Sequence, residues 1–283
     1  MKGKPFLPVC ARRFCPGFRH GFTAIELLAI ITVVGLLASL MVRSFAGTRG
    51  GVVAVQCRNN LRQLVTGWSM YTADNRGKLV YNVEGNGSGL SAGNEAWVVG
   101  YLDFSSSSHN TNTAMLVDHK SFPFGAYLGP YVRDPALFKC PADRSEVVIA
   151  GKRFARVRSV SMNNSLGLHS VIWRGPLVGY TNASQITFPS ALFIILDERP
   201  DSINDGTFMS DPSTSWQIVD FPGAYHNGSG SFCFADGHVE MHRWNDPRTN
   251  PIMVPSLPLP FNQNLPGDLD ILWLQQHAVG QPP

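Results

Sequence analysis

The chain has 283 residues, of which 44% are hydrophobic and 15% are charged, and its formal net charge is +3. Intrinsic disorder is excluded, because disordered chains combine low hydrophobicity with high net charge. The 27 glycines and 20 prolines exclude a coiled coil or a compact helical bundle, because both residues break helices. No block of like charge provides the basic surface that nucleic acids require, so no nucleic-acid partner is predicted.

Residues 1–21 form a basic leader that contains five lysines and arginines and no acidic residue. An apolar segment, 22–43, follows it. The 21 residues from Phe22 to Val42 contain one charge, Glu26, and as a helix they would span about 31 Å, close to the roughly 30 Å hydrocarbon core of a bilayer. The basic leader predicts a single pass through the inner membrane, with the N-terminus in the cytoplasm and the head outside it.

Several kinds of segment share this pattern. A plain signal anchor would explain the apolar run, and so would a secretory signal peptide cleaved at the small-residue site Ser44-Phe45-Ala46. Neither explains Glu26, because a carboxylate inside an apolar run is costly and usually marks a function. A buried core helix is disfavoured by the purely basic leader.

The residues Gly21-Phe-Thr-Ala-Ile-Glu26-Leu-Leu favour a different signal. They resemble the cleavage and methylation site of type IV pilins and type II secretion pseudopilins. The resemblance implies that a prepilin peptidase cuts after Gly21 and methylates the new amine of Phe22. It also implies a structural subunit, not an enzyme, of a type II secretion pseudopilus or a type IV pilus. The alternative is a membrane-anchored extracytoplasmic binding or enzymatic domain on a signal-anchor helix.

Glu26 has a physical role in such a filament. After cleavage, its carboxylate and the amine of Phe22 are both charges in an apolar environment. In a homo- or hetero-oligomeric filament of parallel helices, a shift along the axis places the carboxylate of one subunit beside the amine of the next. Breaking such a buried pair typically costs about 3–5 kcal/mol, so Glu26 is predicted to be the assembly residue.

A second helical pattern covers residues 44–75 and predicts a continuation of the same helix. Apolar residues recur there at three- or four-residue spacing, namely Val53, Cys57, Leu61, Leu64, Trp68 and Tyr71. This stripe predicts that the helix packs on a globular pilin-like head, 76–283. The predicted fold class is α+β, with a long N-terminal helix, membrane-spanning in its first half, packed on an antiparallel β-sheet head with long loops.

Within the head, the sequence predicts short elements separated by polar loops. The predicted strands are 78–83, 96–102, 157–163, 192–197, 230–235 and 238–244, and the predicted short helices are 114–120, 126–132 and 269–277.

A motif near the C-terminus places nine residues between His226 and Asp236-Gly237. Alternating apolar residues on both sides of Asp236-Gly237 predict a hairpin with a two-residue turn, because Asp and Gly tolerate positive φ. Together with the segments Phe138-Lys-Cys140-Pro and Leu196-Asp197-Glu198, this spacing resembles a pilin-like family of environmental bacteria. That resemblance assigns no role to the histidine.

Four residues of this region are candidate metal ligands, namely Asp197, Glu198, Asp236 and His238. The resemblance to pseudopilins implies a structural calcium in the head, whereas two histidines with a carboxylate would suit zinc. A solvated strand face, with His226 hydrogen-bonded to a loop backbone, explains the same residues without an ion and is the interpretation that the sequence favours. No other cofactor is predicted.

Three cysteines lie beyond the leader. Cys57 is on the docking part of the helix and Cys140 precedes a proline in a loop. Because disulfides persist outside the cytoplasm, these two are predicted to pair. Cys233 lies between two phenylalanines of a predicted strand and is expected to stay reduced.

Overall fold

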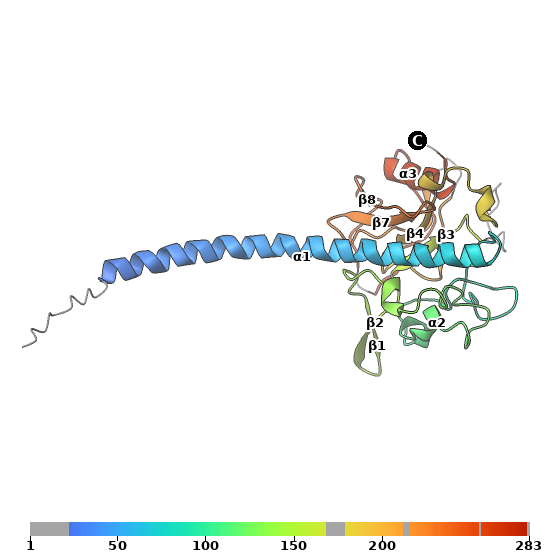
Figure 1. The fold of residues 1–283 in the computed structure, drawn as a ribbon, viewed down its shortest axis with the longest axis horizontal. Helices are drawn as coiled ribbons and strands as arrows, with labels where there is room; N and C mark the ends of the chain where they lie inside the picture. Colours follow the sequence, from blue (N-terminus) through green and yellow to red (C-terminus); the bar gives the residue numbers. More distant parts are fainter. Residues whose placement is uncertain (1–22, 168–178, 212–215, 255, 282–283) are drawn as a thin grey trace, which may run out of the picture. The chain divides into compact units, whose positions relative to one another are not determined.

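The computed structural model describes residues 23–167, 179–211, 216–254 and 256–281, apart from the side chains of 38–49. The chain divides into two units, Met1–Arg49 and Gly50–Pro283. Helix α1, Ala24–Asp74, contributes to both units (Figure 1). The helix ends where the sequence predicts, at the Asn75-Arg76-Gly77 turn, in which Arg76 and Gly77 have positive φ.

Within the unit Gly50–Pro283, α1 buries one face. The residues of the predicted stripe from Cys57 onward are at most 6% exposed, namely Cys57, Leu61, Leu64, Trp68 and Tyr71, and Val53 is half-buried. The opposite face carries exposed polar residues such as Arg62, Gln63 and Thr66. The prediction that residues 44–75 include a helix packed on the head is confirmed from Val53 to Thr72.

The central sheet has five strands in the order β5-β3-β4-β7-β8. They are β3 (Val160–Asn163), β4 (Phe193–Asp197), β5 (Thr207–Phe208), β7 (Ser229–Phe234) and β8 (Val239–Arg243). All neighbours are antiparallel except β3 and β5, which run parallel. The sheet is therefore mixed and not antiparallel throughout, because the chain turns back after β4 and pairs with the free edge of β3.

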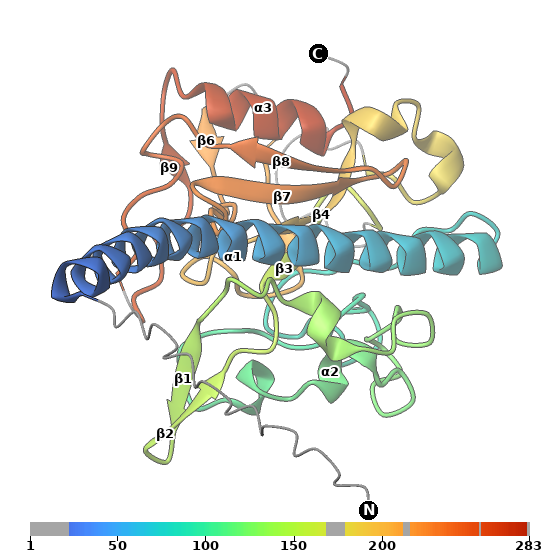
Figure 2. The ribbon, with the colours of Figure 1, turned by 60° about the vertical axis from the view of Figure 1, so that its left-hand side comes forward.

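Alternation along the strands gives this sheet two buried faces. Cys233 belongs to the core cluster that contains Trp68 of α1, whereas its neighbours Phe232 and Phe234 pack against Leu274 of α3 (Leu269–Ala278). The helices α1 and α3 therefore cover opposite faces, and Figure 2 shows them on either side of strands β7 and β8.

The remaining elements in the described part of the chain are short. They are α2 (Ala114–Val117), the hairpin β1 (Glu146–Ile149) and β2 (Lys152–Ala155), the pair β6 (Gln217–Ile218) and β9 (Gln263–Asn264), and four 3₁₀ helices, η1 (Ser108–Asn110), η2 (Pro135–Phe138), η3 (Ala183–Gln185) and η4 (Pro189–Ala191). The β1–β2 hairpin was not predicted, because most of its side chains are exposed and their apolar alternation is weak.

Two predicted strands, 78–83 and 96–102, are wrong. They share a single bridge, Asn82 with Ala96, because their buried backbones bond to separate loops. Leu79 N–H donates to Thr181 O, and Val99 N–H donates to Met115 O. A buried apolar run occurs both in paired strands and in segments whose backbones bond to loops.

The helix predicted at 126–132 is also wrong, since this segment consists of turns. Pro130 supplies no backbone donor. Gly129 lies so close to α2 that a Cβ there would be 1.9 Å from Val117 O. The segment is therefore shaped by its packing against α2 and not by helical hydrogen bonding.

The β7–β8 hairpin is confirmed, but its loop differs from the predicted two-residue turn. Phe234 N–H donates to His238 O at 3.0 Å, and Gly237 N–H donates to Phe234 O at 2.9 Å. These bonds close a three-residue loop, 235–237, in which only Gly237 has positive φ, +88°. Three-residue hairpin loops of this kind consist of a turn followed by a residue with positive φ, here Gly237, at which the second strand begins to pair.

Replacing Gly237 by valine is expected to lower the free energy of unfolding by about 1–2 kcal/mol, because a β-branched residue resists positive φ. A Cβ at this position would meet no atom within 4 Å, so the backbone conformation alone decides the effect. Urea unfolding measures it, with Gly237→Asn as the control that tolerates this conformation and loses less. Equal stability of the two variants would contradict the assigned turn.

Candidate functional site

Of the predicted processing and assembly residues, Gly21 and Phe22 lie outside the described residues, whereas Glu26 lies in the first turn of α1. Thr23 N–H and Thr23 Oγ1–H both donate to Glu26 Oε2 at 2.8 Å, and Glu26 N–H donates to Thr23 Oγ1 at 3.3 Å. This reciprocal arrangement is a capping box. The Thr-x-x-Glu spacing is the sequence pattern of a capping box, so the sequence also indicates a capping role for Glu26 beside the predicted assembly role.

Beyond the cap, α1 presents large apolar side chains that are exposed. Ile25 is 81% exposed, Leu28 is 67% exposed and Ile31 is 60% exposed. Within the described part of the chain, no helix has the length and hydropathy that a membrane crossing needs. The predicted membrane segment, 22–43, continues into the part of α1 whose side chains are not described, and it stays a prediction.

Four buried side chains that can ligate a metal converge in the unit Gly50–Pro283. They are Cys57, Cys140, Asp197 and His226, and one ligand atom of each lies within 4.8 Å of the others. Cys57 Sγ is 3.1 Å from Asp197 Oδ2, across 140 residues of sequence, and Cys140 Sγ is 3.3 Å from His226 Nε2, across 86 residues. The fold therefore brings together donors that are far apart in the chain.

Close packing at the end of β4 positions one half of this cluster. Cys57 projects from the buried face of α1 toward Asp197, the last residue of β4. Gly223 N–H donates to Asp197 O at 2.6 Å, and a Cβ on Gly223 would lie 2.9 Å from Asp197 Cβ. Only glycine allows this approach, which brings the segment that carries His226 against β4.

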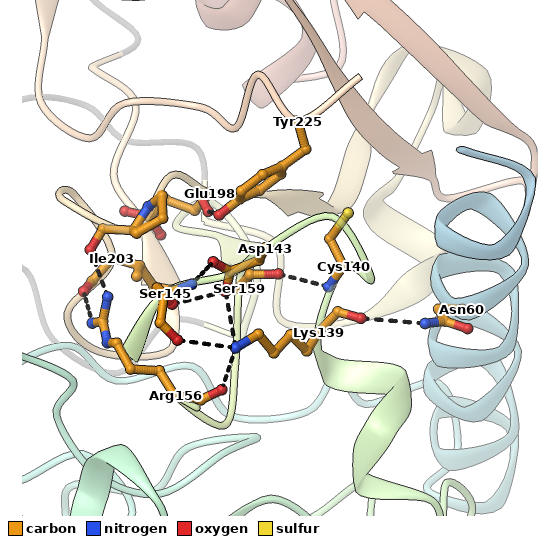
Figure 3. Close-up of polar contacts among 11 residues, drawn as sticks. Asn60, Lys139, Cys140, Asp143, Ser145, Arg156, Ser159, Glu198, Ile203 and Tyr225 are labelled. Atoms are coloured by element: carbon orange, nitrogen blue, oxygen red, sulfur yellow. Dashed lines mark hydrogen bonds and ion pairs between the residues drawn. The ribbon is translucent and has the colours of Figure 1, made fainter. Parts of the chain in front are cut away.

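The loop after η2 positions Cys140 (Figure 3). Cys140 N–H donates to Ser159 Oγ at 2.7 Å, which fixes the backbone at this point. On the other side, Asn60 of α1 donates to Lys139 O at 3.3 Å. Since Asn60 lies less than one helical turn after Cys57, the same contact that ties the loop to α1 brings the two cysteines together.

Hydrogen bonds within the cluster set its protonation. The hydrogen bond from Cys57, followed by that from His226, outweighs burial and lowers the pKa of Cys140 to about 5. The hydrogen bond to Cys140, with burial, raises the pKa of Cys57. Burial acts to lower the pKa of His226, but the hydrogen bond and the charge of Cys140 outweigh it, and that pKa is raised. These contacts therefore favour the thiolate form of Cys140 over its thiol form.

Asp197 supplies the one carboxyl group of the cluster, and its side chain is fully buried. Burial, with the nearby charge of Cys140, raises the pKa of Asp197 to about 8. Its Oδ1 has no hydrogen-bond partner among the described residues. A buried carboxyl oxygen without a partner is unusual, because most such groups are satisfied.

The other candidate ligands from the sequence lie elsewhere. Glu198 Oε1 accepts a hydrogen bond from Ser202 Oγ at 2.8 Å. Asp236 Oδ1 contacts His238 Nδ1 at 2.6 Å at the exposed end of the hairpin. His226 and Asp236 lie at opposite ends of β7, whose six residues span about 20 Å. The nine-residue spacing therefore reflects the length of a strand and not a shared site.

The predicted disulfide between Cys57 and Cys140 is not formed in the structure, where both residues are free thiols. Their sulfurs lie in one cluster, but Cys57 Sγ contacts Asp197 and Cys140 Sγ contacts His226. Cys233 is also a free, buried thiol, in agreement with its prediction. The sequence predicts a disulfide and a separate set of carboxylate and histidine ligands, whereas the structure places both cysteines, Asp197 and His226 in one mixed cluster.

A cavity of about 690 Å³ lies beside the loop that carries Cys140. It is lined by residues close in sequence to the cluster, including Ala142, Asp143, Ala224 and Tyr225, but by none of the four cluster residues. Cys140 itself is 1% exposed. The sulfur of Cys140 is therefore shielded from a substrate in this cavity.

Comparison of the chain with protein-family models, curated proteins and solved structures found no match. The function is therefore inferred from the residues and the geometry of the chain.

Proposed function

We propose that the protein is a structural subunit of a pilin-like filament, a pseudopilus or a type IV pilus, exported with its head outside the cytoplasm. The observation that carries this proposal is the contrast within α1. From Cys57 to Thr72 the helix buries its apolar stripe in the head, whereas nine large apolar side chains between residues 25 and 37 are exposed. Such a helix requires an apolar environment that the head does not supply.

The free energy gained by removing these apolar side chains from water favours a lipid or protein environment for this part of α1. Fully burying one Val, Leu or Ile side chain stabilises by about 1.5–3 kcal/mol, so removing these partly exposed side chains from water is worth on the order of 10 kcal/mol. The inner membrane supplies this environment before assembly, and the helices of neighbouring subunits supply it in the filament. The prepilin peptidase is the partner that releases the mature chain between these two stages.

The residues around Glu26 support the same proposal. The sequence from Gly21 to Leu28 has the prepilin pattern, and the capping box starts α1 at Ala24, directly after Thr23. A helix that begins there carries the carboxylate of Glu26 in its first turn, close to the N-terminus that cleavage after Gly21 would create. This is the geometry in which the carboxylate of one subunit can meet the amine of another.

Replacing Gly21 by leucine is expected to block cleavage and leave a chain that is 21 residues longer than the mature wild type. Mass spectrometry of the membrane fraction measures this, and the wild type should begin with N-methylated Phe22. Gly50→Leu is the control, because a Cβ at Gly50 meets no atom within 4 Å and the cleavage site is intact. A wild-type chain that retains Met1 supports the signal-anchored alternative, and one that begins at Gly47 indicates a secretory signal peptide.

A further inference from the structure

We propose that Cys57, Cys140, Asp197 and His226 bind one zinc ion. Zinc takes four ligands at about 2.3 Å for sulfur, about 2.0–2.1 Å for nitrogen and about 2.0–2.2 Å for oxygen, so neighbouring ligand atoms of a tetrahedral site lie roughly 3.3–3.8 Å apart. Two contacts of the cluster, 3.1 Å and 3.3 Å, are near that spacing, and the four ligand atoms all lie within 4.8 Å of one another. Shifts of about 1 Å complete the tetrahedron.

The burial of the cluster also fits a cation. Asp197 is 0% exposed, and its Oδ1 has no hydrogen-bond partner among the described residues. A bound metal ion would give this carboxyl group a partner, whereas a buried polar atom without one is unfavourable. Ligation uses the deprotonated thiols and carboxyl group and the neutral imidazole, so zinc binding would release protons from the cluster.

The donor atoms select zinc among the common divalent ions. Calcium and magnesium take shells of oxygen atoms, and this cluster offers a single carboxylate. Two thiolates, one imidazole nitrogen and one carboxylate oxygen suit zinc. The calcium that the resemblance implies has no matching shell in these four residues.

Groups around the ligands hold them in place, as outer-shell partners do in metal sites. The hydroxyl of Ser231, in strand β7, lies 3.6 Å from Cys57 Sγ. Ser159, directly before β3, accepts a hydrogen bond from Cys140 N–H at 2.7 Å and so fixes the Cys140 backbone. Strand β7 and the residue before β3 thus support the two cysteine ligands.

All four positions around the ion belong to the protein and are buried, which is the arrangement of a structural zinc site and not of a catalytic one. The ion joins α1, the loop after η2, the end of β4 and the segment before β7. It would therefore hold α1 against the head, as a disulfide between Cys57 and Cys140 would also do.

The zinc content of the full chain, purified in detergent without chelators, tests this proposal. We expect about one zinc ion per chain by elemental mass spectrometry. Cys57→Ser, Asp197→Asn and His226→Gln should each weaken zinc binding by more than about 100-fold, because even an outer-shell partner is worth about 10–100-fold. The matched control is Cys233→Ala, which removes the third buried thiol, outside the cluster, and should keep its zinc.

Two measurements on the wild type keep the test decisive if a variant fails to fold. Co²⁺ added after zinc removal should give the charge-transfer absorption of a cobalt–thiolate bond. The intact mass of the chain without reduction should match free thiols. A chain that binds neither ion would overturn the zinc site. A mass lower by two hydrogens, with Cys57 linked to Cys140 in the peptide map, would replace it with the disulfide.

Discussion

Glu26→Gln is expected to abolish filament assembly while leaving the cap of α1 and the processing of the chain intact. Glutamine at this position completes a capping box as glutamate does, so the hydrogen bonds with Thr23 persist. Only the charge is lost. The amine of Phe22 then has no counter-charge in the apolar interior of the filament, and leaving one member of a buried pair costs about 3–5 kcal/mol per contact.

The converse variant separates the two roles of Glu26. Thr23→Ala removes the capping partner and keeps the charge, so it should weaken the start of the helix by about 1 kcal/mol and still yield filaments. Sheared filament yield and the immunoblot mobility of the mature chain measure both variants. Normal filaments from Glu26→Gln, with failure of Thr23→Ala, would show that Glu26 acts through the cap alone.

The long helix and the central strands were predictable because each carries a strong periodic signal. The stripe from Cys57 to Tyr71 has helical spacing, and Phe232 and Phe234 alternate with Cys233 in a strand that buries both faces. The segments 78–83 and 96–102 were not predictable, since their apolar side chains are buried while their backbones bond to distant loops. Local sequence contains no information about those partners.

The candidate zinc site was predictable only in pieces. His226 and Asp197 were singled out in the sequence, whereas Cys57 and Cys140 were predicted to form a disulfide and are instead free thiols in one cluster. Their convergence depends on close approaches such as that of Gly223 to β4, which no spacing in the chain reveals. The exposed residues Asp236 and His238 looked equally suitable as ligands because their burial could not be read from the sequence.

Asn163→Asp is expected to lower the free energy of unfolding by about 3–5 kcal/mol at pH 7, although it changes a single group of atoms. Asn163 is fully buried at the end of β3, and its Nδ2 donates to Phe193 O at 2.8 Å and to Ala278 O at 2.9 Å. Its Oδ1 accepts from Ser165 N–H at 3.0 Å. One amide thus joins β3, β4 and the end of α3. In an ionised aspartate, a carboxylate oxygen would replace the Nδ2 donor and would repel the two carbonyl oxygens that now accept from it.

The effect should depend on pH with a definite sign. Burial and the two carbonyls disfavour the ionised form, so the pKa of the carboxyl group that this substitution introduces lies, in the folded chain, well above its unfolded value of about 3.9. The variant therefore approaches wild-type stability below about pH 4 and loses stability as the pH rises above it. Even when protonated, the carboxyl group has one donor where the amide has two, so a deficit of about 1 kcal/mol remains.

Urea unfolding of both chains at pH 4 and pH 7 measures this difference, and Asn112→Asp provides the matched control. Asn112 is half-buried, and its Oδ1 accepts a hydrogen bond from Ala114 N–H at 3.1 Å. A carboxylate accepts that bond equally well, so the control should stay within about 0.5 kcal/mol of the wild type at either pH. If Asn163→Asp showed the same small change at both pH values, the buried amide could not be the junction between the sheet and α3, and α3 would have to be held by its apolar contacts with Phe232 and Phe234 alone.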